Sequence, residues 1–109
     1  MNYISMEIAM RYLMGNTHIF SKIKNSFLDS YKNFENDYLF LVKNKESKNL
    51  ECYIHSLKGI SLNLGAYKIY DESNKVLDLL RKGVWDEDEI YMFLYTLKNT
   101  YLELEGLED

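Results

Sequence analysis

The sequence contains no proline among its 109 residues. Proline breaks helix interiors, so its absence favours long uninterrupted helices and marks no linker between domains. Cysteine is nearly absent too, and Cys52 is the single one. A single cysteine excludes an internal disulfide and is typical of a reducing compartment. We therefore expect one domain over residues 1–109, located in the cytoplasm.

An excess of positive charge and long apolar runs are also missing. The formal net charge is −4, so nucleic acid is not an expected partner, because phosphate backbones require a basic surface. No apolar run approaches the roughly 18 residues that a membrane span needs, so membrane insertion is not expected. What the chain does have is 47% hydrophobic residues and 15% aromatic residues, enough for a packed core.

Apolar residues recur at the three- and four-residue spacing of amphipathic helices and do not alternate as they would in strands. We expect a short helix over about 6–14 with Ser5 as its N-cap, and a long helix from Thr17, as its N-cap, to near Lys43. The expected fold class is all-α, an up-and-down antiparallel four-helix bundle with a short additional N-terminal helix. The remaining three helices are expected from Asn44 or Ser47 to Gly65, then to Arg81-Lys82-Gly83, and from a capping box at Asp86 and Glu89 through Leu104.

The third expected helix, which begins at Asn44 or Ser47, carries the run His55-Ser56-Leu57-Lys58-Gly59 near its middle. Histidine, lysine and glycine at positions i, i+3 and i+4 lie on one helical face. With about 100° per residue, His55 falls roughly 160° from Leu57, so it is expected in water, with its nitrogens accessible. The residues within roughly 60° of Leu57, which form the expected buried face, are Leu50, Tyr53, Ile54, Ile60, Ser61 and Leu64.

The outer face beside His55 has the character of a docking surface. Gly59 costs the helix about 0.5–1 kcal/mol relative to alanine, which favours a position where a partner approaches the backbone closely. Leu62 lies on the same face and is apolar where the pattern predicts solvent, so it is a candidate docking residue. The other candidate partner-binding residues on this outer half are Cys52, Glu51 and Lys48.

The motif His-x-Leu-Lys-Gly, followed by Leu64-Gly65-Ala66, resembles that of the histidine-containing phosphotransfer (HPt) domain family of multistep two-component relays. The resemblance covers nearly the whole chain, and Gly15-Asn16 resembles the Gly-Asp that often precedes the second helix of the family. One departure is Val76-Leu77, which stands where the family often carries Leu-Glu.

The resemblance implies a phosphocarrier. His55 would accept a phosphoryl group from the phospho-aspartate of a receiver domain and pass it to the aspartate of a second receiver. Lys58 would neutralise charge on the phosphoryl oxygens, and Gly59 would admit the receiver. The implied partners are response-regulator receiver domains and a hybrid sensor histidine kinase. The chain would be monomeric and need no cofactor, because the receiver supplies the magnesium.

Two alternatives from other classes stay open. A helical binding module would dock or sequester a receiver through the same face, with Leu62 as anchor and without carrying phosphate. A metal or redox protein would use Cys52, His55 and His18, although two of these at helical spacing do not make a site. The glycines form no phosphate-binding G-x-x-x-x-G-K-[ST] loop, so an ATP-dependent kinase is not expected.

Overall fold

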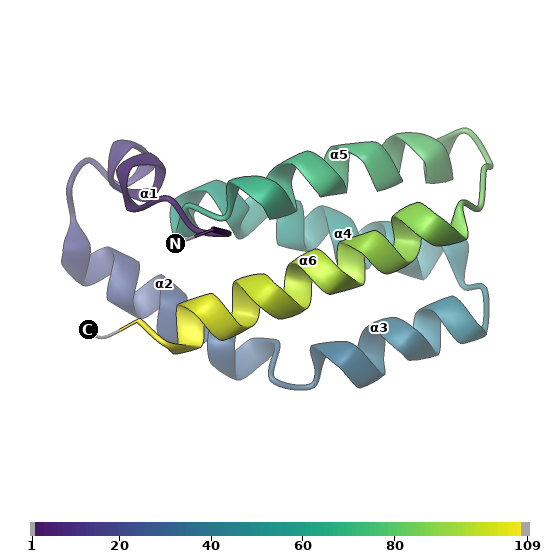
Figure 1. Ribbon diagram of the computed structural model, residues 1–109, viewed down its shortest axis with the longest axis horizontal. Coiled ribbons are helices and arrows are strands. Elements are labelled where there is room, and N and C mark those ends of the chain that lie inside the picture. Colours follow the sequence, from purple (N-terminus) through teal and green to yellow (C-terminus); the bar gives the residue numbers. More distant parts are fainter. Residues whose placement is uncertain (1, 108–109) are drawn as a thin grey trace.

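The computed structural model describes residues 2–107, and within them it contains helices and no strands (Figure 1). Helices α3 to α6 run back and forth along the long axis of a body measuring 39 × 23 × 21 Å. Within this range no helix combines the length and the apolar character needed to cross a membrane. The presence of helices alone among residues 2–107 confirms the all-α prediction. The elements are α1 (Met6–Tyr12), α2 (Thr17–Ser30), α3 (Phe34–Lys43), α4 (Ser47–Ser61), the 3₁₀ turn η1 (Leu62–Leu64), α5 (Tyr67–Arg81) and α6 (Glu87–Glu105).

The single long helix predicted from Thr17 to Lys43 is wrong. Two helices occupy this stretch, because α2 ends at Ser30 and α3 begins only at Phe34. The prediction relied on the absence of proline, but proline is only one of the causes of a helix end. The predicted end near Lys43 is confirmed.

A side chain from α6 forms a hydrogen bond with the last turn of α2, next to the break between α2 and α3. The Tyr101 hydroxyl donates a hydrogen bond to the carbonyl oxygen of Leu28 at 2.7 Å. In an uninterrupted helix that carbonyl would accept from the N–H of Lys32, four residues later. Instead the chain turns tightly, and the N–H of Phe34 donates to the carbonyl of Tyr31 at 2.9 Å. The three-residue turn is close to one helical turn in length, so the buried aromatic residues keep the spacing of a single helix across the break. These residues are Phe20 and Phe27 on α2 and Phe34 and Tyr38 on α3.

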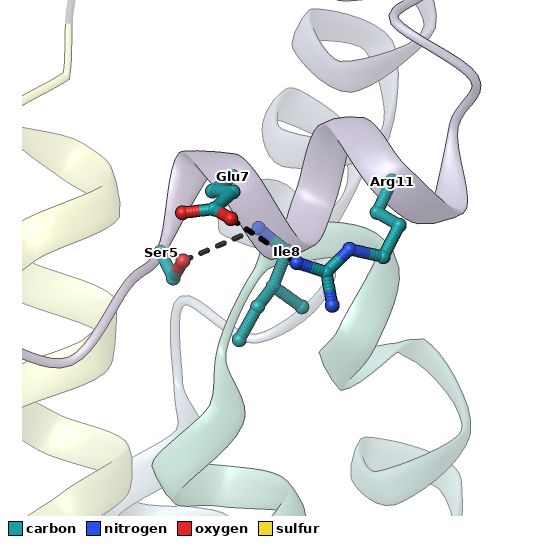
Figure 2. A network of polar contacts seen from close by, with 4 residues as sticks. All are labelled: Ser5, Glu7, Ile8 and Arg11. Atoms are coloured by element: carbon teal, nitrogen blue, oxygen red, sulfur yellow. Dashed lines mark hydrogen bonds and ion pairs between the residues drawn. The ribbon is translucent and has the colours of Figure 1, made fainter.

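The first helix is held by local polar contacts that the sequence predicted in part. The Ser5 hydroxyl accepts a hydrogen bond from the N–H of Ile8 at 3.2 Å, which confirms Ser5 as the N-cap (Figure 2). Glu7 and Arg11, four residues apart, form an exposed ion pair at 3.1 Å. Such pairs add a few tenths of a kcal/mol, about 0.2–0.5, to a short helix.

Two other helix starts differ in part from the prediction. The N-cap of α2 is Asn16 and not Thr17, and its side-chain oxygen accepts from the N–H of Ile19 at 3.0 Å. Asp86 caps α6 as predicted, because its carboxylate accepts from the N–H of Glu89 at 3.1 Å. Among the described residues the Glu89 carboxylate accepts no reciprocal bond from the Asp86 N–H, and no donor faces its buried Oε2.

Glu89 lies close to a second carboxyl group, that of Glu72 on α5. Burial, followed by the charge of Glu72, raises the pKa of Glu89 above its ordinary value of 4.5, while Lys75 acts in the opposite direction. A carboxyl whose pKa is raised by folding binds its proton more tightly in the folded than in the unfolded chain. Its contribution to stability is therefore present at low pH and is lost as the pH rises through the folded pKa.

We predict that Glu89→Gln raises the free energy of unfolding near pH 7 and leaves it unchanged well below pH 4.5. Glutamine keeps a group that can share a hydrogen bond with Glu72 but removes the second negative charge. Urea unfolding at a series of pH values measures the difference, and Glu87→Gln, an exposed change in the same helical turn, is the matched control. An unchanged difference between wild type and Glu89→Gln across this pH range would contradict the prediction.

The predicted inner face of α4 is confirmed, and the turn after it determines where the N-terminal segment lies. Leu50, Ile54, Leu57 and Leu64 are buried, and Tyr53 and Ile60 are partly buried and pack against the core. α4 ends at Ser61, and Gly65 then adopts a left-handed conformation with φ +69°. The carbonyl of Gly65 accepts a hydrogen bond from the N–H of Ser5 at 2.8 Å. The Leu-Gly-Ala segment is therefore a structural turn on which the start of α1 rests.

The first described residues are also bound to α6. The carboxylate of Glu103 accepts hydrogen bonds from the backbone N–H groups of Asn2 at 2.9 Å, Tyr3 at 3.1 Å and Ile4 at 2.7 Å. One carboxylate thus satisfies three consecutive backbone donors. The segment that leads into α1 is in consequence held between the Gly65 turn and α6.

Candidate functional site

His55 lies near the middle of α4 and is exposed, as its position on the helix predicts. Among residues 2–107 it takes part in no hydrogen bond and no ion pair, so both imidazole nitrogens are available. Leu57, two residues later, is 1% exposed and fixes the opposite face of the helix in the core. The imidazole is therefore presented to solvent by a rigid helix whose rotation is set by packing.

One side of His55 opens into a hollow of about 270 Å³, here called the Lys58 hollow. Lys58 is partly buried, and its ammonium nitrogen lies 5.6 Å from the centre of the Tyr70 ring on α5. No carboxylate of the described residues pairs with Lys58. The hollow thus places an imidazole next to a positive charge that no anion has neutralised. Its lining residues are Tyr12, His55, Lys58, Gly59, Leu62, Asn63 and Tyr70.

Gly59 lies on the exposed face beside His55. Within the part of the chain that the structure describes, a Cβ added at Gly59 would meet nothing within 4 Å, and the backbone there does not have a positive φ. Neither packing within the chain nor backbone conformation therefore requires glycine. The cost of glycine in the helix is instead consistent with a surface that must stay open to a partner.

The other side of His55 opens into a second hollow of about 410 Å³, here called the Arg81 hollow. Arg81 on α5 donates to Glu51 on α4 at 3.0 Å, and Lys48 lies 3.9 Å from the same carboxylate. Cys52 lines this hollow and is exposed. The positive charges on this side therefore face a carboxylate of their own chain.

The ion pair of Arg81 was not predicted from the sequence, which identified that arginine only as a cation at a helix end. Glu51 and Arg81 are 30 residues apart in the chain and meet because α4 packs on α5. No helical spacing relates them, so only a three-dimensional arrangement can reveal the pair. The predicted docking residues thus fall into two groups: Leu62 lies in the Lys58 hollow, and Lys48, Glu51 and Cys52 lie in the Arg81 hollow.

A larger groove of about 700 Å³ runs between α2 and α4, one residue away from the histidine. Its floor is apolar, and its rim carries serines, including Ser56, which follows His55 directly. This groove was not predicted from the sequence, because its walls come from two helices and the residue pattern of neither helix determines their relative placement. Its lining residues are Lys22, Ile23, Ser26, Phe27, Ser30, Tyr31, Ser56 and Ile60.

The residues of the metal or redox alternative are not gathered into one place. His18 is exposed in the first turn of α2, whereas Cys52 and His55 lie on α4. In the described part of the chain no three histidine, cysteine, aspartate or glutamate side chains are arranged to hold a metal ion.

No protein-family model, no curated protein and no solved structure matches the chain. The function is therefore inferred from the residues around His55 and from their geometry.

Proposed function

We propose that the protein is a phosphocarrier of a two-component relay that accepts a phosphoryl group on His55. The observation that carries this proposal is the exposed His55, without any partner in the described chain, with Lys58 and Gly59 on the same face of α4. The motif around these residues resembles that of the HPt family. A phosphoryl acceptor, a cation and an unobstructed approach are the three elements that such a transfer needs.

The proposed fold is the one that this family implies. α2 and α3 together would form one rod, and α4, α5 and α6 the other three, of an up-and-down antiparallel four-helix bundle with α1 at one end. The short connections between successive helices support this proposal, because they favour antiparallel neighbours.

The proposed reaction is an in-line displacement at phosphorus. The lone pair on Nε2 of neutral His55 forms the N–P bond while the P–O bond of the receiver's acyl phosphate breaks. The electron pair of the broken bond leaves with the aspartate carboxylate, and the proton on Nδ1 stays on the ring. Lys58 would stabilise the charge spread over the equatorial oxygens, which is the main requirement of phosphoryl transfer.

The proposed partners are those that the resemblance to the HPt family implies. A hybrid sensor histidine kinase would supply the phosphoryl group through its receiver domain, and a second response-regulator receiver would take it. The magnesium belongs to the receivers, and we propose that the chain acts as a monomer without a cofactor. The groove between α2 and α4 lies next to His55 and offers a receiver an apolar contact area.

Incubation with a phosphorylated receiver domain, or with phosphoramidate, tests the proposal. We expect one added phosphoryl group by mass spectrometry, labile in acid and stable in base, and none in His55→Gln with unchanged helical circular dichroism. Labelling of His55→Gln equal to wild type would refute it. Absence of any adduct from folded wild type with both donors would also refute it and would favour the module that docks a receiver without carrying phosphate.

A further inference from the structure

The two hollows beside His55 differ in the state of their positive charges. In the Arg81 hollow, Glu51 already faces Arg81 at 3.0 Å and Lys48 at 3.9 Å. Its side chain is 20% exposed, so this carboxylate is partly shielded from water. Glu51 would repel an anion entering that hollow and would compete with it for Arg81 and Lys48. The Arg81 hollow is therefore the poorer of the two sites for a phosphoryl group.

In the Lys58 hollow the positive charge is held differently. The Lys58 ammonium lies 5.6 Å from the centre of the Tyr70 ring, within the range of a cation–π contact. An aromatic face attracts a cation through its quadrupole but carries no net charge. The contact thus restricts the position of the lysine without neutralising it, whereas an ion pair would do both.

We propose that Tyr70 is a positioning residue that holds the Lys58 ammonium beside His55, so that the phosphoryl group is received in the Lys58 hollow. Tyr70 does not touch the reacting atoms in this proposal and acts through Lys58. The inference rests on the proposed function and deepens it, because it assigns the side of the imidazole on which the phosphoryl group lies.

The geometry of the helices supports this role. His55 and Lys58 are one turn apart on α4, and Tyr70 comes from α5, the helix that packs on α4. A free lysine side chain samples many rotamers. Restricting it before the phosphoryl group arrives lowers the entropic cost of ordering the lysine during transfer. The same ring can release the ammonium when a dianionic group offers a stronger attraction.

Phosphoramidate labelling of the full chain tests the role without requiring a receiver. The phosphorus forms a bond to His55 while its bond to nitrogen breaks and ammonia leaves, so the rate reports the site alone. We expect Tyr70→Leu and Tyr70→Gln to slow labelling about two- to fivefold, the range expected from a cation–π contact at an exposed site. Tyr70→Phe keeps the ring and is expected to label at the wild-type rate.

A second background separates positioning from a general structural effect. In Lys58→Ala, the Tyr70→Leu change is expected to cause no further slowing, because the group on which Tyr70 acts is absent. Equal slowing by Tyr70→Leu with and without Lys58, or wild-type labelling by both ringless variants, would overturn the inference. Circular dichroism identifies a variant that has lost its fold, and two ringless variants are used so that one folded protein remains. If wild type itself takes no label, the proposed function has failed; if wild type labels and Tyr70 has no effect, only the role of Tyr70 has failed.

Discussion

Replacement of Gly65 by alanine is expected to lower the free energy of unfolding by about 2–4 kcal/mol. Gly65 has φ +69°, and a Cβ built there would overlap the backbone carbonyl group of Ser5. The backbone of residue 65 fixes the position of the Cβ, and the atoms that it overlaps are backbone atoms of Ser5. No side-chain rotation can therefore relieve the overlap. The hydrogen bond from the Ser5 N–H to the Gly65 carbonyl, 2.8 Å long, would also be disturbed. Thermal unfolding should show a midpoint roughly 10–25 °C below that of wild type.

Gly83 provides the matched control for this change. It has a similar positive φ of +77°, but a Cβ there would meet no atom of residues 2–107 within 4 Å. Gly83→Ala is therefore expected to incur only the backbone strain, about 1–2 kcal/mol. Equal destabilisation by Gly65→Ala and Gly83→Ala would show that the contact with Ser5 contributes nothing and would contradict the prediction.

Replacement of Gly59 by glutamine is expected to have opposite effects on stability and on transfer. Glutamine is the better helix former, and nothing among residues 2–107 opposes its Cβ, so the fold should become more stable by about 0.5 kcal/mol. The added side chain would stand beside His55, where a receiver approaches in the proposed function. Phosphoryl transfer from a receiver that phosphorylates wild type should fall at least about tenfold, or 1.4 kcal/mol in the barrier.

The small donor provides the control for Gly59→Gln. Phosphoramidate does not need the space that a folded domain needs, so its labelling of His55 should remain within about twofold of wild type, a barrier difference of roughly 0.4 kcal/mol. Loss of labelling by both donors would indicate damage to the site instead of a steric block. Unchanged transfer from the receiver would show that Gly59 is not on the docking surface.

The parts of the fold that the sequence predicted are those controlled by residues close together in the chain. Ser5 and Asp86 cap their helices, and the buried face of α4 follows from the spacing around Leu57. The break at Tyr31 was missed because a contact from α6, the Tyr101 hydroxyl on the Leu28 carbonyl, lies 73 residues away. A turn that preserves the aromatic register leaves no trace in the periodicity.

The candidate site divides in the same way. His55, Lys58 and Gly59 share one helical face and were identified from their spacing. Tyr70 and Arg81 come from α5, and their contacts with Lys58 and Glu51 depend on how α5 is rotated against α4. The sequence distinguishes Tyr70 only as an aromatic residue that lies beside, and not within, the apolar stripe of its helix.

The hydrogen bonds of residues 2–5 bear on the order in which the chain folds. The N–H of Ile4 reaches Glu103 across 99 residues, and the N–H of Ser5 reaches Gly65, whereas α4, α5 and α6 pack on their neighbours in the chain. Closing a long loop has a larger entropic cost than closing a short one, so we expect the N-terminal segment to attach after these helices have paired. α1 carries Tyr12 into the Lys58 hollow. The pocket beside His55 is then completed by the last folding step, and hydrogen exchange at the Ile4 amide would report how often it comes apart.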